Sequence, residues 1–297
     1  MAKWHKKSPT KLKTVGEAIL DYIRSKENIL SPSSVRGYYI IFNNCIESIS
    51  YIKLSEIDEK ALQAWVNANS TNYAPKSVKS QYSLVSSALR QNKIKLDYGS
   101  VLLPRIVKKE PVIPDEEQIG QILHMVEGTS VELPVTMAVI LGMRQSEIAG
   151  LKWSDYDGNS IYIHGSIVPN KENKYIYKNT TKSNASTRLI SVDGILKERL
   201  DRAERKSEFI SPMLPSSVLR KFNHLCDKNG LPRFTMHSQR HANASVMLAN
   251  GVPDKYAMAR LGQSSPSMVK NVYQHLYEDK EKQYATEILE KFNDLAK

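Results

Sequence analysis

Three stretches in the second half of the chain carry side chains that suit chemistry on a phosphodiester. The first contains Arg144, the second is a His-x-x-Arg group with His237 and Arg240, and the third ends at Tyr273. A guanidinium is always charged and presents a rigid fork of donors, so two of them suit a phosphate that gains negative charge under attack. An imidazole can move a proton, and a phenol can be the nucleophile once a base removes its proton. Taken singly, each residue is more often structural.

In this order the stretches resemble the tyrosine recombinase (phage integrase) family. The resemblance rests on an Arg box at 141–155, the His-x-x-Arg group at 237–240, a Leu-Gly-x-Ser-Ser turn at 261–265 and the Asn-Val-Tyr of 271–273. A lone His-x-x-Arg would mean little, whereas the ordered set at suitable spacing is specific. The resemblance covers the second domain and extends loosely to the N-terminal helical segment of the chain.

The resemblance implies a role for each residue. Arg144 and Arg240 would hold the scissile phosphate, and His237 would act as general acid and base. Tyr273 would be the nucleophile and leave a 3′-phosphotyrosine and a free 5′-hydroxyl. Tyr277, one helical turn later, is its nearest rival and is expected to pack. The covalent link conserves the bond energy, so no cofactor and no metal ion is expected.

Further residues are assigned to supporting roles. By resemblance Lys182, on a polar turn before an alternating segment, would protonate the leaving 5′-oxygen, and Lys178 is a possible rival. Glu147, three residues after the arginine of its box, would orient it across a helical turn. Gln263 stands where the family commonly has His or Trp, and its amide can bind a phosphate oxygen but cannot exchange a proton. His241 lacks a motif position and is expected to be buried and hydrogen-bonded.

The elements that must position these residues are mainly helical. Apolar residues recur at helical spacing in four segments of the first hundred residues, and helix starts are predicted at 31–34, 57–58 and 75–77, with one helix expected to run from Val35 to Ile49. Helices are also expected at 115–126, at 133–142, from 194 and at 279–296. Alternating segments at 161–163, 175–177 and 187–192 suit one small antiparallel sheet. The expected fold class is therefore mainly α with a small antiparallel β-sheet.

The predicted organisation has four parts. They are a basic tail (1–13), a four-helix, SAM-like core-site DNA-binding domain (14–92), a linker (93–113) and a mixed α/β tyrosine-recombinase catalytic domain (114–297), with a C-terminal docking helix at about 280–297. The apolar stripe of that helix would cover its own core or dock on a neighbouring protomer. The tail is too short for a folded arm-site domain, so the protein lacks one or is truncated.

Composition and charge limit the class of protein and its partners. The 297 residues are 41% hydrophobic, which suits two domains, and no apolar run approaches the ~20 residues that span a bilayer. The two cysteines lie far apart without a CxxC, which disfavours a disulfide or a zinc site and favours the cytoplasm. Of the net charge of +11, +9 lies before residue 113, where 18 Lys and Arg face nine Asp and Glu. This asymmetry favours nucleic acid first and an anionic membrane second.

The expected function is site-specific DNA recombination, such as integration of a mobile genetic element. The protein would clamp double-stranded recombination sites, cut one strand at a time through Tyr273 and exchange strands through a Holliday junction. It is expected to be a homo-tetramer on DNA and a monomer free in solution, with accessory DNA-bending proteins as further partners and with no membrane. It would be cytoplasmic, and nucleoid-associated when bound to DNA.

Two alternatives stay open. A catalytically weak or inactive member of the same fold would occupy DNA without cutting it, and Gln263 is the sequence support for that alternative. A type IB topoisomerase would use similar residues to relax supercoils as a monomer. A metal-dependent nuclease is disfavoured, because the sequence shows no clustered carboxylates with histidine ligands.

Overall fold

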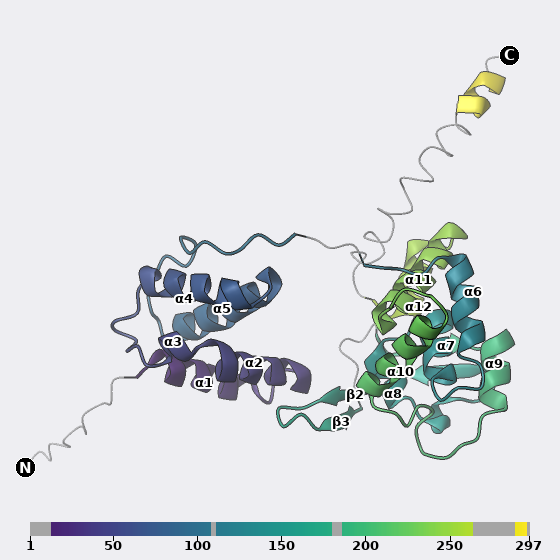
Figure 1. Ribbon diagram of the computed structural model, residues 1–297, viewed down its shortest axis with the longest axis horizontal. Coiled ribbons are helices and arrows are strands. Elements are labelled where there is room, and N and C mark those ends of the chain that lie inside the picture. The colour runs from purple at the N-terminus through teal and green to yellow at the C-terminus, as the bar shows by residue number, and fades with distance from the viewer. Residues whose placement is uncertain (1–12, 108–110, 180–185, 264–288, 296–297) are drawn as a thin grey trace, which may run out of the picture. The chain divides into compact units, whose positions relative to one another are not determined.

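The chain forms two compact units in a computed structural model (Figure 1). The structure describes residues 13–107, 111–179, 186–263 and 289–295. The first unit groups residues 1–109 with 169–176, and the second groups 110–168 with 177–297. Within the described ranges, no helix is both long and apolar enough to cross a bilayer.

The first unit is built from helices, most of which start at caps that the sequence supplies. They are α1 (Val15–Lys26), α2 (Pro32–Cys45), α3 (Glu47–Ser50), α4 (Glu59–Asn72) and α5 (Pro75–Gln91). Thr14 and Glu17 form a reciprocal capping box at α1, and the side chains of Ser31 and Asp58 cap α2 and α4. Helix α1 packs against α2, α3 and α5, and α4 packs against α5.

The single helix predicted for Val35–Ile49 is interrupted in the structure. Ile46 has φ −111° and ψ 2°, outside the helical region, and its side chain is buried. The carbonyl oxygen of Cys45 accepts hydrogen bonds from the side chains of Trp65 (2.7 Å) and Asn69 (3.1 Å). Two side chains from α4 thus satisfy a carbonyl at the end of α2, where the helix leaves an acceptor unpaired.

The first unit continues beyond residue 92, into the segment predicted as a linker. Val101 is buried, and Leu103 packs against the same core. The Tyr82 hydroxyl donates a 2.7 Å hydrogen bond to the carbonyl of Tyr98. Apolar contacts therefore hold the chain onto the helices until about residue 103.

The second unit places a nearly fully buried helix at its centre. Its helices are α6 (Glu116–Met125), α7 (Glu132–Leu141), α8 (Gln145–Gly150), α9 (Gly194–Asp201), α10 (Pro215–Lys228), α11 (Met236–Ala249) and α12 (Asp254–Leu261), with a 3-10 turn at Trp153–Asp155. Helix α7 packs against α6, α8, α9 and α11, so most of its surface is enclosed. It ends at Gly142 in the left-handed region (φ +60°), where a Cβ would lie 2.5 Å from Leu261 and 2.8 Å from Asn243. Only glycine fits this turn, which leads the chain into α8.

The three predicted strand segments occur, but in two small sheets rather than one. Strands β1 (Ser160–Ile163) and β4 (Arg188–Ser191) pair antiparallel, with Ile163 opposite Arg188. Strand β3 (Tyr175–Lys178) pairs instead with β2 (Ser166–Pro169), a segment that the alternation pattern does not predict. Gly165 makes room for the hydroxyl of Tyr177, so a side chain at Gly165 would clash with this ring.

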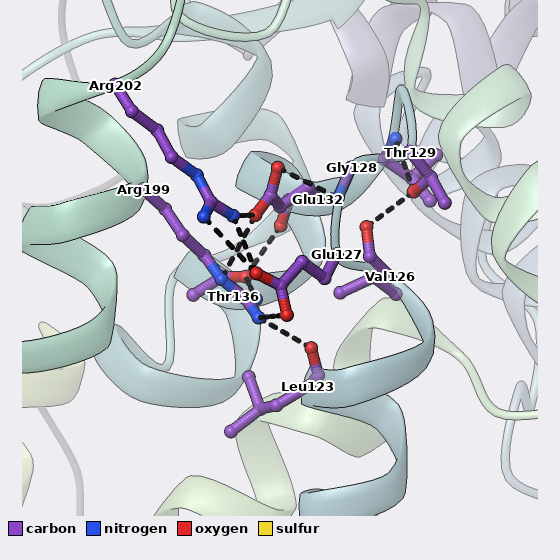
Figure 2. Close-up of polar contacts among 10 residues, drawn as sticks. Leu123, Val126, Glu127, Gly128, Thr129, Glu132, Thr136, Arg199 and Arg202 are labelled. Atoms are coloured by element: carbon purple, nitrogen blue, oxygen red, sulfur yellow. Dashed lines mark hydrogen bonds and ion pairs between the residues drawn. The ribbon is translucent and has the colours of Figure 1, made fainter.

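A buried ion-pair cluster ties α9 to α6 and α7 (Figure 2). The Arg199 side chain is 2% exposed and donates to Thr136 Oγ1 (2.6 Å) and to the Leu123 carbonyl (2.7 Å). Its Nε lies 3.1 Å from Glu132, which also pairs with Arg202. The cluster compensates a buried charge with a carboxylate, a hydroxyl and a backbone oxygen.

Both cysteines are free and buried. Cys45 lies in the core of the first unit, and Cys226 lies on α10 in the core of the second. Burial raises the pKa of the Cys226 thiol, which keeps the sulfur protonated and unreactive.

Candidate active site

Arg144 immediately precedes α8 as its N-cap residue, and the Glu147 carboxylate holds it in place. The backbone N–H of Arg144 donates to Glu147 Oε2 (2.9 Å), and its Nη1 donates to Glu147 Oε1 (2.5 Å). Its Nη2 donates to the carbonyl oxygen of Gly262 (2.8 Å). The Glu147 side chain is 3% exposed, whereas that of Arg144 is 32% exposed. The carboxylate is thus enclosed, and the guanidinium keeps one side open to a ligand.

Arg240, on α11, is a buried cation that is bonded only to backbone oxygens. Its Nη1 donates to the Gly142 carbonyl (2.6 Å) and its Nη2 to the Leu261 carbonyl (2.5 Å). Among the described residues no carboxylate lies within 4.0 Å of it, and its Nε has no hydrogen-bond partner. Desolvation, followed by repulsion from Arg144, lowers the pKa of Arg240 to about 9, which still leaves it charged at neutral pH.

The two arginines meet at the end of α12. Arg240 binds the carbonyl of Leu261 and Arg144 binds that of Gly262, so two consecutive peptide groups anchor both guanidiniums. Gly262 has φ +62°, and the N–H of Gln263 donates to the Met258 carbonyl (3.0 Å). The Leu-Gly-x turn of the sequence motif is therefore a helix C-terminus that adjoins both arginines.

The two histidines of α11 form a ring pair beside Arg240. His237 is exposed in the first turn, and His241 is half-buried with its ring centroid 4.6 Å away at 81°. Desolvation, then the charges of Arg240 and Arg144, lower the pKa of His237. Desolvation, then His237, lower the pKa of His241 to about 4, and its enclosed Nδ1 finds no hydrogen-bond partner. The hydrogen bond expected for His241 is therefore not found at this nitrogen.

The structure describes some of the remaining predicted residues and not others. Gln263 is half-buried at the α12 turn, and Lys178 ends β3. Lys182, Tyr273 and Tyr277 lie outside the described residues.

Arg188 is a member of this cluster that the motifs do not single out. It is 9% exposed, and it donates from Nε to the Arg260 carbonyl (2.7 Å), from Nη1 to the Ser186 carbonyl (2.9 Å) and from Nη2 to Glu147 (3.1 Å). Burial raises the pKa of Glu147, but Arg188 and then Arg144 outweigh this and hold it below its usual value. The alternation of β4 carries the signal, because the buried positions are 188 and 190 while Leu189 is exposed. An arginine on the inward side of a strand indicates a buried partner.

The cluster combines three guanidiniums with one carboxylate and thus keeps an excess of positive charge. Like charges held together in a partly enclosed site repel one another, and a bound anion relieves that repulsion. Planar guanidiniums match the oxygens of a phosphate. No group of three or more metal-ligating side chains occurs in the described part of the chain.

Comparison with known proteins agrees with this geometry. The model of the phage integrase family matches residues 114–280. The XerC-like tyrosine recombinase of Caldanaerobacter subterraneus is 26% identical over 212 residues, which cover 61% of this chain and 53% of that protein. The chain thus spans about half the length of that relative.

Solved structures show the same fold. The Tn1549 transposon integrase in complex with transposon right-end DNA superposes with a TM-score of 0.75 at 16% identity, covering 93% of this chain and 99% of that one. A lambda integrase tetramer bound to a Holliday junction superposes with a TM-score of 0.68 at 19% identity, covering 91% and 82%. With an Arg box, a His-x-x-Arg helix and a Leu-Gly turn in one cluster, and with the family model matching more than half of its residues, the chain belongs to the phage integrase family of tyrosine recombinases.

Proposed function

We propose that the protein is a site-specific DNA recombinase that cuts and rejoins strands through Tyr273. The observation that carries this proposal is that Arg240, a buried cation with no paired carboxylate among the described residues, and Arg144 bind the consecutive carbonyls of Leu261 and Gly262. A buried charge without a counter-ion costs free energy, and a scissile phosphate would supply the missing anion. The membership of the chain in the phage integrase family supports the same reaction.

In the cleavage step the phenol oxygen of Tyr273 attacks the phosphorus. A bond forms between that oxygen and phosphorus, the bond to the 5′-oxygen breaks, and the 3′ phosphate stays on the protein. Arg144 and Arg240 stabilise the charge that builds on the non-bridging oxygens. Because both guanidiniums are held by carbonyls and Glu147 before DNA arrives, little reorganisation is needed.

Two proton transfers balance the reaction. His237 accepts the proton of the phenol, and its lowered pKa keeps the imidazole neutral and able to do so at pH 7. Lys182 gives a proton to the leaving 5′-oxygen. In religation the free 5′-hydroxyl attacks the phosphotyrosine and the same groups run in reverse. Gln263, one residue after Gly262, binds a phosphate oxygen through its amide and takes no part in proton transfer.

The remaining parts of the chain are assigned to DNA binding and assembly. The basic helical unit, residues 14–92 with the segment that follows, contacts one side of the duplex, and residues 114–297 form the catalytic domain on the other. Leu289, Phe292 and Leu295 are 63–76% exposed in the helical segment 289–295, which supports docking on a neighbouring protomer. Lambda integrase forms a tetramer on a Holliday junction, and we assign the same assembly to this chain. The protein acts in the cytoplasm, on nucleoid DNA.

A nicked suicide substrate tests the proposal. The leaving 5′ fragment diffuses away, so cleavage traps the protein on the DNA as a covalent adduct. We expect an adduct with the wild-type chain and none with Tyr273→Phe, which should still bind the duplex. Binding without an adduct would support the alternative of an inactive DNA-binding protein. A supercoiled plasmid with two sites tests the other alternative. Relaxation of its supercoils without exchange between the sites would support a topoisomerase.

A further inference from the structure

Arg188 contacts three segments that the reaction must keep in register. Its guanidinium binds Glu147 on α8, the Arg260 carbonyl on α12 and the Ser186 carbonyl just before β4. Arg144 is the residue that precedes α8, and α12 leads through Gly262 to Gln263. The third segment, at Ser186, follows directly on the chain from residues 180–185, which include Lys182. One buried side chain therefore connects the elements that carry several residues of the proposed site.

The backbone at Gly262 packs closely against the Arg188 guanidinium. A Cβ at Gly262 would lie 2.6 Å from Arg188 Nη1 and 3.1 Å from its Cζ. The absence of a side chain at Gly262 is thus what admits the guanidinium. Each of its three nitrogens donates to a different oxygen, an arrangement that the single ammonium of a lysine cannot reproduce.

The ion pair between Arg188 and Glu147 also affects the charge of Arg144. Glu147 is shared by Arg144 and Arg188, with Oε1 on Arg144 and Oε2 on Arg188. If Arg188 were absent, the hydrogen-bonded partner of Glu147 would be Arg144 alone, and the two would form a neutral pair. With Arg188 present, one carboxylate is divided between two guanidiniums, and Arg144 keeps positive charge for a ligand.

We propose that Arg188 is a positioning residue that neutralises Glu147 and thereby leaves the charge of Arg144 available to the scissile phosphate. This role rests on the proposed function, since it requires that Arg144 binds phosphate. Arg188 itself does not touch the reacting atoms. Its effect reaches the phosphate through Glu147 and through the two carbonyls that it fixes.

The experiment compares single-turnover cleavage of the suicide substrate by Arg188→Met, Arg188→Lys and the double variant Arg188→Met/Glu147→Gln. We expect Arg188→Met to cleave about 100-fold more slowly than wild type, the loss typical of a misplaced catalytic group. Arg188→Lys, which keeps the charge but loses the fork, should lose about 10-fold. The double variant should recover about 10-fold over Arg188→Met, because neutral glutamine no longer withdraws charge from Arg144. Each rate is divided by the concentration of folded protein, and circular dichroism gives the folded fraction of each variant.

Arg199→Met is the matched control. It also removes a buried arginine from a carboxylate, but in the ion-pair cluster of α9 with α6 and α7, which contains no residue of the proposed site (Figure 2). It should lower the melting temperature and leave the cleavage rate of the folded protein within about 2-fold of wild type. If Arg188→Met behaves like this control, or if the double variant is slower than Arg188→Met, the positioning role is overturned. If Arg188→Met does not fold, a rate for Arg188→Lys equal to wild type overturns it. If neither the wild type nor the control forms an adduct, the proposed function fails first.

Discussion

Replacing Gly262 by alanine should damage both stability and cleavage, because the glycine meets two separate demands. Its φ of +62° lies in the left-handed region, which costs an alanine about 1 kcal/mol. Its Cβ position lies 2.6 Å from Arg188 Nη1 and 3.1 Å from the Cα of Ser186. The guanidinium must therefore move, which disturbs its hydrogen bond to the Ser186 carbonyl, and a hydrogen bond made by a charged group contributes about 1.5–3 kcal/mol. We expect a total loss of about 3 kcal/mol.

The chain supplies a control that separates the two demands. Gly251 has φ +69° at the end of α11, and nothing lies within 4 Å of a Cβ built there. Gly251→Ala should thus suffer only the backbone strain of about 1 kcal/mol. Denaturant unfolding gives both stabilities, and the suicide substrate gives both cleavage rates. We expect Gly262→Ala to cleave at least about 10-fold more slowly than Gly251→Ala, because Arg144 also binds the Gly262 carbonyl. Equal stabilities and equal rates would refute the reasoning from the Arg188 contact.

Three further predictions follow from the same contacts. The lowered pKa of His237 means that the imidazole stays neutral to lower pH than a free histidine, so the acid half-point of cleavage should lie below about 6.5. A pH–rate profile measures it, and a half-point above that value would contradict the assigned base. Arg199→Met should cost about 3 kcal/mol, because Glu132 and the Leu123 carbonyl lose a buried donor, and denaturant unfolding tests this. A loss under about 0.5 kcal/mol would contradict it. Affinity for duplex DNA should fall steeply with salt, with a log–log slope of about −0.9 for each phosphate contacted. Titrations at several salt concentrations measure the slope, and a value near zero would contradict phosphate binding.

The sequence predicts the helices well where a local signal marks their ends. Asp115 caps α6 and forms a reciprocal box with Gln118, and Pro75 opens α5. The sequence does not predict the break at Ile46, because the side chains that satisfy the Cys45 carbonyl there lie about 20 residues further along the chain. The second sheet was missed for a similar reason, since the pairing of β2 with β3 is a tertiary contact that short alternating segments do not specify.

In the site, too, the sequence predicts what local motifs mark and misses what depends on tertiary contacts. Motif spacing singled out Arg144 and Arg240, and the structure brings both to the end of α12. Strand alternation places Arg188 on the inward side of β4, but its importance comes from a buried carboxylate 41 residues earlier, and no local pattern indicates that partner. The assignments of Lys182 and Tyr273 stay predictions from the resemblance.

The two buried thiols make this chain convenient for site-directed labelling. Cys45 and Cys226 are its only cysteines, and both are enclosed. A maleimide dye should therefore react with an added surface thiol in preference to either native one. Tyr51, 84% exposed in the first unit, and Ile195, 41% exposed in the second, are suitable positions for such a thiol. Fluorophores can thus be attached to either unit without first removing the natural sulfhydryls.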